Sequence, residues 1–213
     1  MTFFDFSSRL NNSRVLHYIN PAYMRRSCSP APNFHILGEL AGTLNINAPA
    51  YFTAFPAILP DTLETIRTIE EEKCTGLSGA PIIYVDILHH PKRKEYDMSS
   101  LVFGIIGAAP VSPKLMEQLE HEIPIKVMSQ AFGQTENTGL LTVSVFAGDD
   151  KQRRYGSVGR AIPSAEIKVT DVDGRILPIG QEGEVCTRGF HIMKGIFYCL
   201  SSLSISNLYR LLW

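Results

Sequence analysis

The sequence has little net charge and no long apolar run. Its 20 basic and 21 acidic residues leave a formal net charge of −1, which gives no electrostatic basis for binding nucleic acid or an anionic membrane. A transmembrane helix needs about 20 consecutive apolar residues, and no stretch of the chain reaches that length. The sequence therefore predicts neither a nucleic-acid partner nor a transmembrane segment, and it leaves the oligomeric state open.

Cysteine is also scarce. The four cysteines, Cys28, Cys74, Cys186 and Cys199, form no C-x-x-C pair and have no histidine at ligand spacing. Because paired spacings mark zinc sites and disulfide frameworks, both are disfavoured and a reducing compartment is expected. Apolar residues make up 45% of the 213 residues, which is enough for the core of one large domain or two small ones.

Residues 1–30 differ in composition from the rest of the chain. They are rich in serine, and they carry four arginines but a single acidic residue, Asp5. This composition is loosely typical of an organelle transit peptide, and it suits a leader without an addressing role equally well. We predict a poorly structured leader over residues 1–30, which Pro30 and Pro32 close.

Helix signals recur in the middle of the chain. An acidic or hydroxyl side chain before an apolar periodic segment caps a helix, and proline is favoured at the first helical position. The caps are Asn33, Asp61 with Glu64 three residues later, Pro81, and Ser112 followed by Pro113. The predicted helices are a short one within 33–42, one from Asp61 to the acidic run 70–72, one at 82–89, and one beginning at Pro113.

Apolar runs between these helices predict strands. The run 101–107 is almost continuously apolar, which is typical of a parallel strand covered on both faces. The run 123–128 predicts a second buried strand, bounded by Pro124. A short strand is expected at 74–77, and another within 43–59, where prolines interrupt the pattern.

Strands that alternate with helices are typical of an α/β fold with right-handed crossovers. We therefore predict parallel-rich sheet layers with flanking helices over 31–150. Ligands of such sheets bind at the carboxyl ends of the strands. Two glycine-containing turns follow predicted strands, at 107–110 and 130–136, and their small side chains let the backbone approach a flat ligand closely.

The pattern changes near Tyr155. Segments 157–160, 165–170 and 183–188 alternate or carry β-branched residues, with turn residues between them. We predict a small antiparallel β subdomain over 151–195; a β extension of the main sheet is the alternative. The tail, 196–213, is apolar and serine-rich, and we expect it to be exposed unless it covers an edge strand.

The stretch 130–136 contains three groups suited to a nucleotide with Mg²⁺. The Phe132 ring can stack on a base, the Thr135 hydroxyl can bond a phosphate oxygen, and the Glu136 carboxylate can hold a hard cation. Gly133 permits the sharp turn that this stretch requires. Taken alone, such a stretch is more often a strand end with a polar turn. Likewise His35 suits a pocket wall, although a partly buried structural histidine is the simpler interpretation.

Five motifs together resemble the adenylate-forming acyl-CoA synthetase/AMP-ligase superfamily. In order they are 33–35, 107–110, 132–136, 156–160 with 166–168, and 183–189. Segments 72–77, 79–81 and 85–88 resemble the mitochondrial medium-chain fatty acyl-CoA ligases (the acyl-CoA synthetase family member 2 type). The similarity covers about residues 30–195, and the order and spacing make it specific.

The resemblance implies part of the large N-terminal domain of an ATP-dependent fatty acid–CoA ligase. Such an enzyme forms acyl-AMP and then acyl-CoA, with Mg²⁺ and with coenzyme A as co-substrate. It also implies the mitochondrial matrix as the location, with the cytoplasm as the alternative. The implied roles are adenine framing by Gly107, Ala108, Ala109, Pro110 and Phe132, cofactor binding by Gly133, α-phosphate binding by Thr135, Mg²⁺ binding by Glu136, and an acyl-pocket wall at Phe34 and His35.

The sequence also departs from the family pattern. It has no serine-, threonine- and glycine-rich phosphate loop ending in lysine, and Phe132 replaces the usual tyrosine. The match ends at Gly195, before the ribose-binding aspartate, the hinge and the domain that carries the catalytic lysine. We therefore expect an internal fragment of a ligase, inactive by itself; a non-catalytic module that binds nucleotide or acyl groups, or pairs with another subunit, is the alternative.

Overall fold

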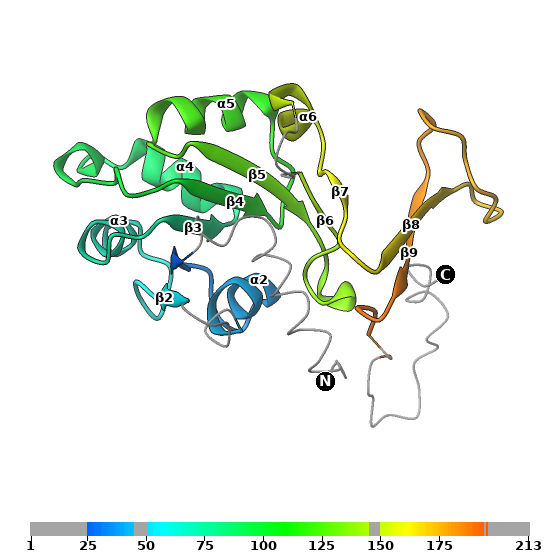
Figure 1. Ribbon diagram of the computed structural model, residues 1–213, viewed down its shortest axis with the longest axis horizontal. Helices are drawn as coiled ribbons and strands as arrows, with labels where there is room; N and C mark the ends of the chain where they lie inside the picture. The colour runs from blue at the N-terminus through cyan, green and yellow to red at the C-terminus, as the bar shows by residue number, and fades with distance from the viewer. Residues whose placement is uncertain (1–24, 45–50, 145–149, 194, 196–213) are drawn as a thin grey trace.

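The structure, a computed structural model, describes residues 25–44, 51–144, 150–193 and 195. It contains a seven-stranded sheet of order β2-β1-β3-β4-β5-β6-β7 and a two-stranded sheet of β8 and β9 (Figure 1). Neighbouring strands from β2 to β5 are parallel, and the pairs β5–β6, β6–β7 and β8–β9 are antiparallel. The predicted fold class, a parallel-rich α/β sheet followed by a small antiparallel sheet, is confirmed.

The strands are β1 (Arg26–Cys28), β2 (Phe52–Ala54), β3 (Gly76–Gly79), β4 (Phe103–Gly107), β5 (Val127–Phe132), β6 (Thr142–Val143), β7 (Arg160–Ala161), β8 (Ala165–Thr170) and β9 (Glu184–Gly189). The α-helices are α2 (Ile36–Gly38), α3 (Thr62–Glu71), α4 (Pro81–His89), α5 (Pro113–Glu122) and α6 (Lys151–Gly156). A π-helical turn, η1 (Glu39–Thr43), continues α2, and the 3₁₀ turns are η3 (Arg93–Glu95) and η4 (Thr135–Asn137). None of the described helices is long and apolar enough to cross a membrane.

The helices begin where local capping chemistry directs them. The Asp61 carboxylate accepts a hydrogen bond from the Glu64 amide at 2.9 Å, and the Ser112 hydroxyl accepts one from the Leu115 amide at 3.2 Å. Pro81 opens α4, since the missing amide proton costs nothing at a first helical position. These predicted caps are confirmed. The Asn33 cap is wrong: His35 caps α2 through Nδ1, which accepts from the Leu37 amide at 3.1 Å.

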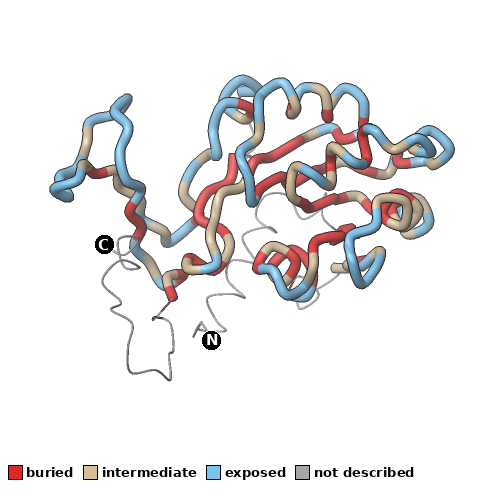
Figure 2. The backbone as a smooth tube through the Cα atoms, turned by 180° about the vertical axis from the view of Figure 1, so that it is seen from behind, coloured by how far each residue is buried: buried red, intermediate tan, exposed pale blue. Residues whose placement is uncertain are grey.

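Two apolar clusters cover the two faces of the large sheet. Residues of α3, α4 and α5 pack with Leu77, Ile106 and Met128 on one face. On the other face Leu40 and Ala41 of η1 pack with Phe103 and Ile105. Strand β4 is therefore buried on both sides, as its continuous apolar sequence predicts, and Figure 2 shows the buried strands enclosed by helices with exposed outer surfaces.

The predicted boundaries of the strands at 123–128 and 74–77 are wrong, the first because of long-range pairing and the second because of a local hydrogen bond. Strand β5 begins at Val127 rather than Ile123 and continues to Phe132, since its ladder with β4 extends to the pair Gly107–Ala131. Strand β3 begins at Gly76, because the Cys74 amide still bonds back to the Ile69 carbonyl at the end of α3.

Other corrections concern the ends of the predicted units. Strand β1 lies inside the predicted leader and pairs with β2 and β3, so residues 26–28 are ordered by the sheet; residues 1–24 lie outside the described part. Strand β7 joins the large sheet through β6, so the small sheet consists of β8 and β9. The strand expected within 43–59 is β2, and residues 45–50 and the tail 196–213 lie outside the described residues.

Candidate functional site

The two predicted ligand turns lie side by side at the carboxyl ends of β4 and β5. Gly107 ends β4 opposite Ala131, and a Cβ added at Gly107 would lie 2.6 Å from the Ala131 carbonyl oxygen. Only glycine fits this approach of two backbones. The next residue, Ala108, has φ +69°, so the chain leaves the sheet abruptly, and residues 108–110 are exposed. The fold thus presents bare backbone at the edge where α/β sheets bind ligands.

The loop after β5 folds back tightly on itself. The Gln134 amide donates to the Asn137 side-chain oxygen at 2.8 Å, and the Gly139 amide donates to the Gln134 carbonyl at 2.8 Å. A Cβ added at Gly133 would lie 2.2 Å from the Gly139 carbonyl oxygen, so the turn requires glycine there. Local hydrogen bonds therefore fix the backbone that carries Thr135 and Glu136.

Thr135 is exposed and Glu136 is partly exposed. Neither side chain makes a hydrogen bond or ion pair to another residue of the described chain. Both polar groups are thus available to a ligand, and Phe132, half-buried at the end of β5, precedes them. A hydroxyl and a carboxylate presented this way suit a phosphate and its accompanying cation.

His35 stands across from these turns, at the start of α2. Its Nδ1 accepts the Leu37 amide, so the proton of the neutral ring is on Nε2, which makes that nitrogen a donor. Phe34 beside it is 89% exposed. The hydrogen bond that caps α2 thus fixes the His35 ring, which offers a donor nitrogen beside the exposed Phe34 ring.

A narrow hollow of about 40 Å³ connects His35 with the two turns. Gly107, Ala108 and Gly133 form one side, and α2 and η1 form the other. Its apolar lining also comes from Leu40, Ala41, Ile105 and Leu140. These residues were not singled out from the sequence, because which side of a helix or strand faces a ligand depends on how the elements pack.

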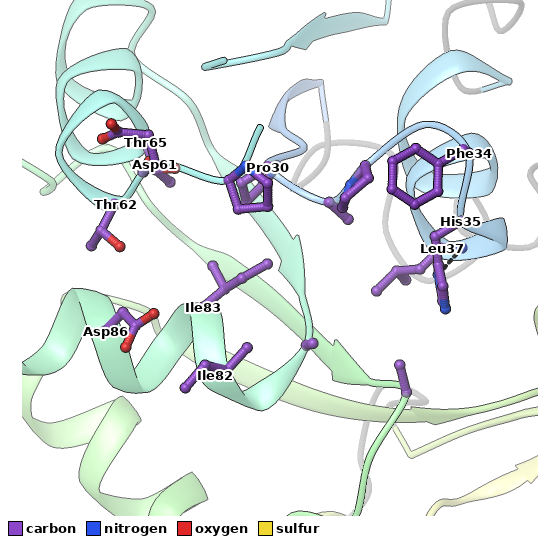
Figure 3. A pocket seen from close by; sticks show the side chains of 15 residues that line it. Pro30, Phe34, His35, Leu37, Asp61, Thr62, Thr65, Ile82, Ile83 and Asp86 are labelled. Atoms are coloured by element: carbon purple, nitrogen blue, oxygen red, sulfur yellow. Dashed lines mark hydrogen bonds between the residues drawn. The ribbon is translucent and has the colours of Figure 1, made fainter. Parts of the chain in front are cut away.

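A wider cavity of about 400 Å³ (Figure 3) adjoins the narrow one. The two share His35, Leu37 and Ala108 in their walls. The wider cavity lies between the 30–37 segment and the first turns of α3 and α4. Apolar side chains such as Ile82 and Ile83 line it, and Asp61, Thr62 and Asp86 lie at one end. Of the other predicted site residues, Phe34 lines this cavity, whereas Ala109, Pro110, Phe132, Thr135 and Glu136 line neither hollow.

A polar cluster holds the other end of β5. The Glu120 carboxylate accepts hydrogen bonds from the Met128 amide at 2.9 Å, from the Arg154 guanidinium at 3.0 Å and from the Tyr155 hydroxyl. Burial raises the pKa of Glu120, but the bonds from Tyr155, Met128 and Arg154 outweigh burial and leave its pKa below the ordinary value. The cluster joins α5 and α6 to β5 and so stabilises the strand that ends in the candidate site.

The chain is similar in sequence to AMP-binding enzymes and to acyl-CoA ligases. The sequence profile described as AMP-binding enzyme matches residues 7–197. Acyl-CoA ligase sidI of Aspergillus fumigatus is 35% identical over 87% of the chain, and the putative acyl-CoA synthetase YngI of Bacillus subtilis is 35% identical over 81%. The human mitochondrial medium-chain acyl-CoA ligase ACSF2 is 30% identical over 87%. The chain spans 32%, 31% and 31% of these three proteins, about a third of their length.

Solved structures agree on the fold. ATP-bound MatB from Rhodopseudomonas palustris superposes with a TM-score of 0.77 at 22% identity, over 91% of this chain and 37% of that one. The anthranilate CoA ligase AuaEII, in complex with anthranoyl-AMP, superposes with a TM-score of 0.77 at 21% identity, over 87% of this chain and 36% of that one.

Proposed function

Since this chain belongs to the AMP-binding enzyme family, we propose that it forms the nucleotide- and acid-binding portion of an acyl-CoA ligase. The observation that carries the proposal is the meeting of two glycine-containing strand ends with His35 around one apolar hollow. The loop that follows Gly133 carries the Thr135 hydroxyl and the Glu136 carboxylate, which have no protein partner in the described part of the chain. The reaction is ATP-dependent activation of a medium-chain fatty acid. The similarity to ligases named acyl-CoA ligase and medium-chain acyl-CoA ligase supports this assignment.

The turn 107–110 and the Phe132 ring would frame the adenine, and the Thr135 hydroxyl would donate to the α-phosphate. The fatty carboxylate attacks the α-phosphorus and pyrophosphate leaves, giving acyl-AMP. The thiol of coenzyme A then attacks the acyl carbon, and AMP leaves with the bonding electrons. Because this chemistry depends mostly on positioning and charge stabilisation, a rigid loop with fixed donors is what it requires.

The donor set of the site fits Mg²⁺ only together with a nucleotide. The described residues contain no group of three or more histidine, cysteine or acidic side chains that could hold a metal ion. Mg²⁺ commonly binds through one or two carboxylates plus substrate phosphates, and Glu136 supplies one carboxylate without a protein partner. When bound, the ion would neutralise phosphate charge; Glu136 would hold it beside Thr135.

We assign the acyl chain to the wider cavity. The narrow hollow, at about 40 Å³, has room for only a few water-sized groups. The wider cavity, at about 400 Å³, has the volume of an ordinary ligand pocket, and Phe34, His35, Ile82 and Ile83 line it. Since the two hollows meet at His35 and Ala108, an acid in the wider cavity would direct its carboxylate toward the nucleotide turns.

Binding of Mg·ATP to the purified chain tests the proposal. Calorimetric titration should show ATP binding that strengthens with Mg²⁺, and Glu136→Gln should remove most of the Mg²⁺ dependence, because an amide binds Mg²⁺ less well than a carboxylate. The matched control is Glu117→Gln, on the exposed side of α5, which should bind like the parent. Equal Mg²⁺ dependence in the parent and in Glu136→Gln would overturn the assigned role.

We also propose the mitochondrial matrix as the location. Relatives named mitochondrial ACSF2, from Danio rerio and Homo sapiens, support it at 34% and 30% identity, while other relatives are fungal and bacterial. Imaging of the chain with a C-terminal fluorescent tag tests this assignment, and a diffuse cytoplasmic signal would contradict it.

A further inference from the structure

The segment after β9 holds the loop that carries Thr135 and Glu136. The Thr138 hydroxyl donates to the His191 carbonyl, across 53 residues of sequence, and the Met193 amide donates to the Glu136 carbonyl at 2.9 Å. Thr138 is fully buried and has φ +61°, a conformation that a non-glycine residue adopts only when its surroundings impose it. The loop therefore depends on residues 191–193 for its position.

The His191 side chain packs against β9, while its own carbonyl accepts the bond from the loop. It is 0% exposed, and its Nε2 lies 3.1 Å from the Thr187 hydroxyl. Its Nδ1 has no hydrogen-bond partner among the described residues. The ring lies against Gly189, where an added Cβ would be 2.6 Å from Nδ1. An imidazole is thus enclosed beside a glycine, with one hydrogen bond.

We propose that His191, held neutral, is a positioning residue that locks the Thr135–Glu136 loop onto the β8–β9 ribbon, and that its protonation releases the loop. In the part of the chain that the structure describes, no charged side chain hydrogen-bonds to this ring. Arg188 of β9 pairs with Glu166 of β8 on the exposed side of the ribbon, and Glu136 meets the segment through its backbone carbonyl. A proton on the buried ring would therefore be uncompensated.

The direction of the pH effect follows from burial. Burial lowers the pKa of His191 below its ordinary value of 6.5. A group whose pKa is lower in the folded state stabilises the fold fully above its unfolded pKa, and this contribution is lost as the pH falls through the folded pKa. The lock should thus be closed at pH 7.5 and should weaken as the pH falls below about 6.5.

Hydrogen–deuterium exchange of the amides in residues 134–140 measures the lock without relying on activity. His191→Ala should raise their exchange about tenfold relative to the parent, the size expected for loss of one hydrogen bond. Thr187→Val should act in the same direction and gives the same test if His191→Ala does not fold. His191→Gln can keep a hydrogen bond to Thr187 but cannot titrate. It should therefore restore the parent's exchange protection in residues 134–140, and that protection should not depend on pH between pH 7.5 and 5.5. The control is His121→Gln, at an exposed position of α5.

Parent-like exchange in His191→Ala and Thr187→Val, or an unchanged pH dependence in His191→Gln, would overturn the proposal. Its consequence for ligand binding rests on the proposed function: Mg·ATP affinity of the parent should fall with the exchange protection as the pH is lowered. A parent that binds no Mg·ATP would refute the proposed function, while the exchange data would still decide whether the lock exists.

Discussion

Gly133 and Gly156 are glycines in opposite surroundings. A Cβ at Gly133 would meet the Gly139 carbonyl oxygen at 2.2 Å, whereas a Cβ at Gly156, the last residue of α6, would find nothing within 4 Å. The first glycine therefore allows two backbone segments to meet, and the second makes no such close approach. The difference lies in the tertiary contacts rather than in the residue type.

We expect Gly133→Ala to lower the free energy of unfolding by about 1–3 kcal/mol, because the added methyl group must displace backbone. Gly156→Ala is the control, and its effect should stay within about 0.5 kcal/mol, as for an unconstrained surface position. Urea unfolding followed by circular dichroism measures both values. Equal stability of the two variants would show that the loop can widen without cost.

At the scale of elements, hydrogen bonds to the Glu120 carboxylate of α5 join α5 and α6 to β5. Glu120 receives the Met128 amide of the strand and both Arg154 and Tyr155 of α6. Arg154 also donates to the Met128 carbonyl at 3.0 Å. The strand that ends at Phe132 is thus fixed at its start by charged hydrogen bonds and at its end by the tight loop.

Glu120→Gln should lower the free energy of unfolding by about 2 kcal/mol, since it removes hydrogen bonds to a charged acceptor. The pKa of Glu120 is lowered in the folded state, so the parent's advantage is complete above the ordinary carboxyl pKa and is lost as the pH falls through the folded pKa. Unfolding measured at pH 7 and in steps below pH 4.5 checks this trend. The same loss in Glu117→Gln, on the exposed side of α5, would contradict the assignment.

At the scale of the whole molecule, the two sheets differ in how far they are covered. The large sheet has helices on both faces, whereas the β8–β9 ribbon stands beside it (Figure 1) and carries exposed apolar side chains in its turns, Val172, Ile176 and Ile179. The chain spans about a third of the curated relatives it matches.

We predict that residues 1–213 by themselves form no acyl-CoA from a medium-chain acid, ATP and coenzyme A, because they include no serine-, threonine- and glycine-rich loop ending in lysine. Each missing charged contact, such as that of a phosphate-loop lysine, costs about 3–4 kcal/mol of transition-state stabilisation. Mass spectrometry of the thioester, with a full-length medium-chain acyl-CoA ligase as the positive control, measures the product. Turnover at about 1 s⁻¹ or faster, an ordinary enzymatic rate, would refute the prediction.

The sequence alone determined the order and type of most elements. Caps such as Asp61 and Ser112 act within one turn of helix. The continuous apolar run 101–107 predicts a strand that is buried on both faces, and β4 is buried along its length. The spacing of the motifs was likewise sufficient to identify the family. The site roles of Thr135, Glu136 and the turn 107–110 remain predictions, although the structure brings Gly107, Ala108, Gly133 and His35 around one hollow.

Only the tertiary structure decided where strands end and which distant residues meet. The extent of β5 follows from its ladder with β4, and the inclusion of β1 follows from pairing with β2 and β3. The contact of Thr138 with His191 joins residues 53 apart. Caps and periodicity reflect interactions over about four residues, whereas ladders and buried contacts depend on partners that the local sequence does not specify.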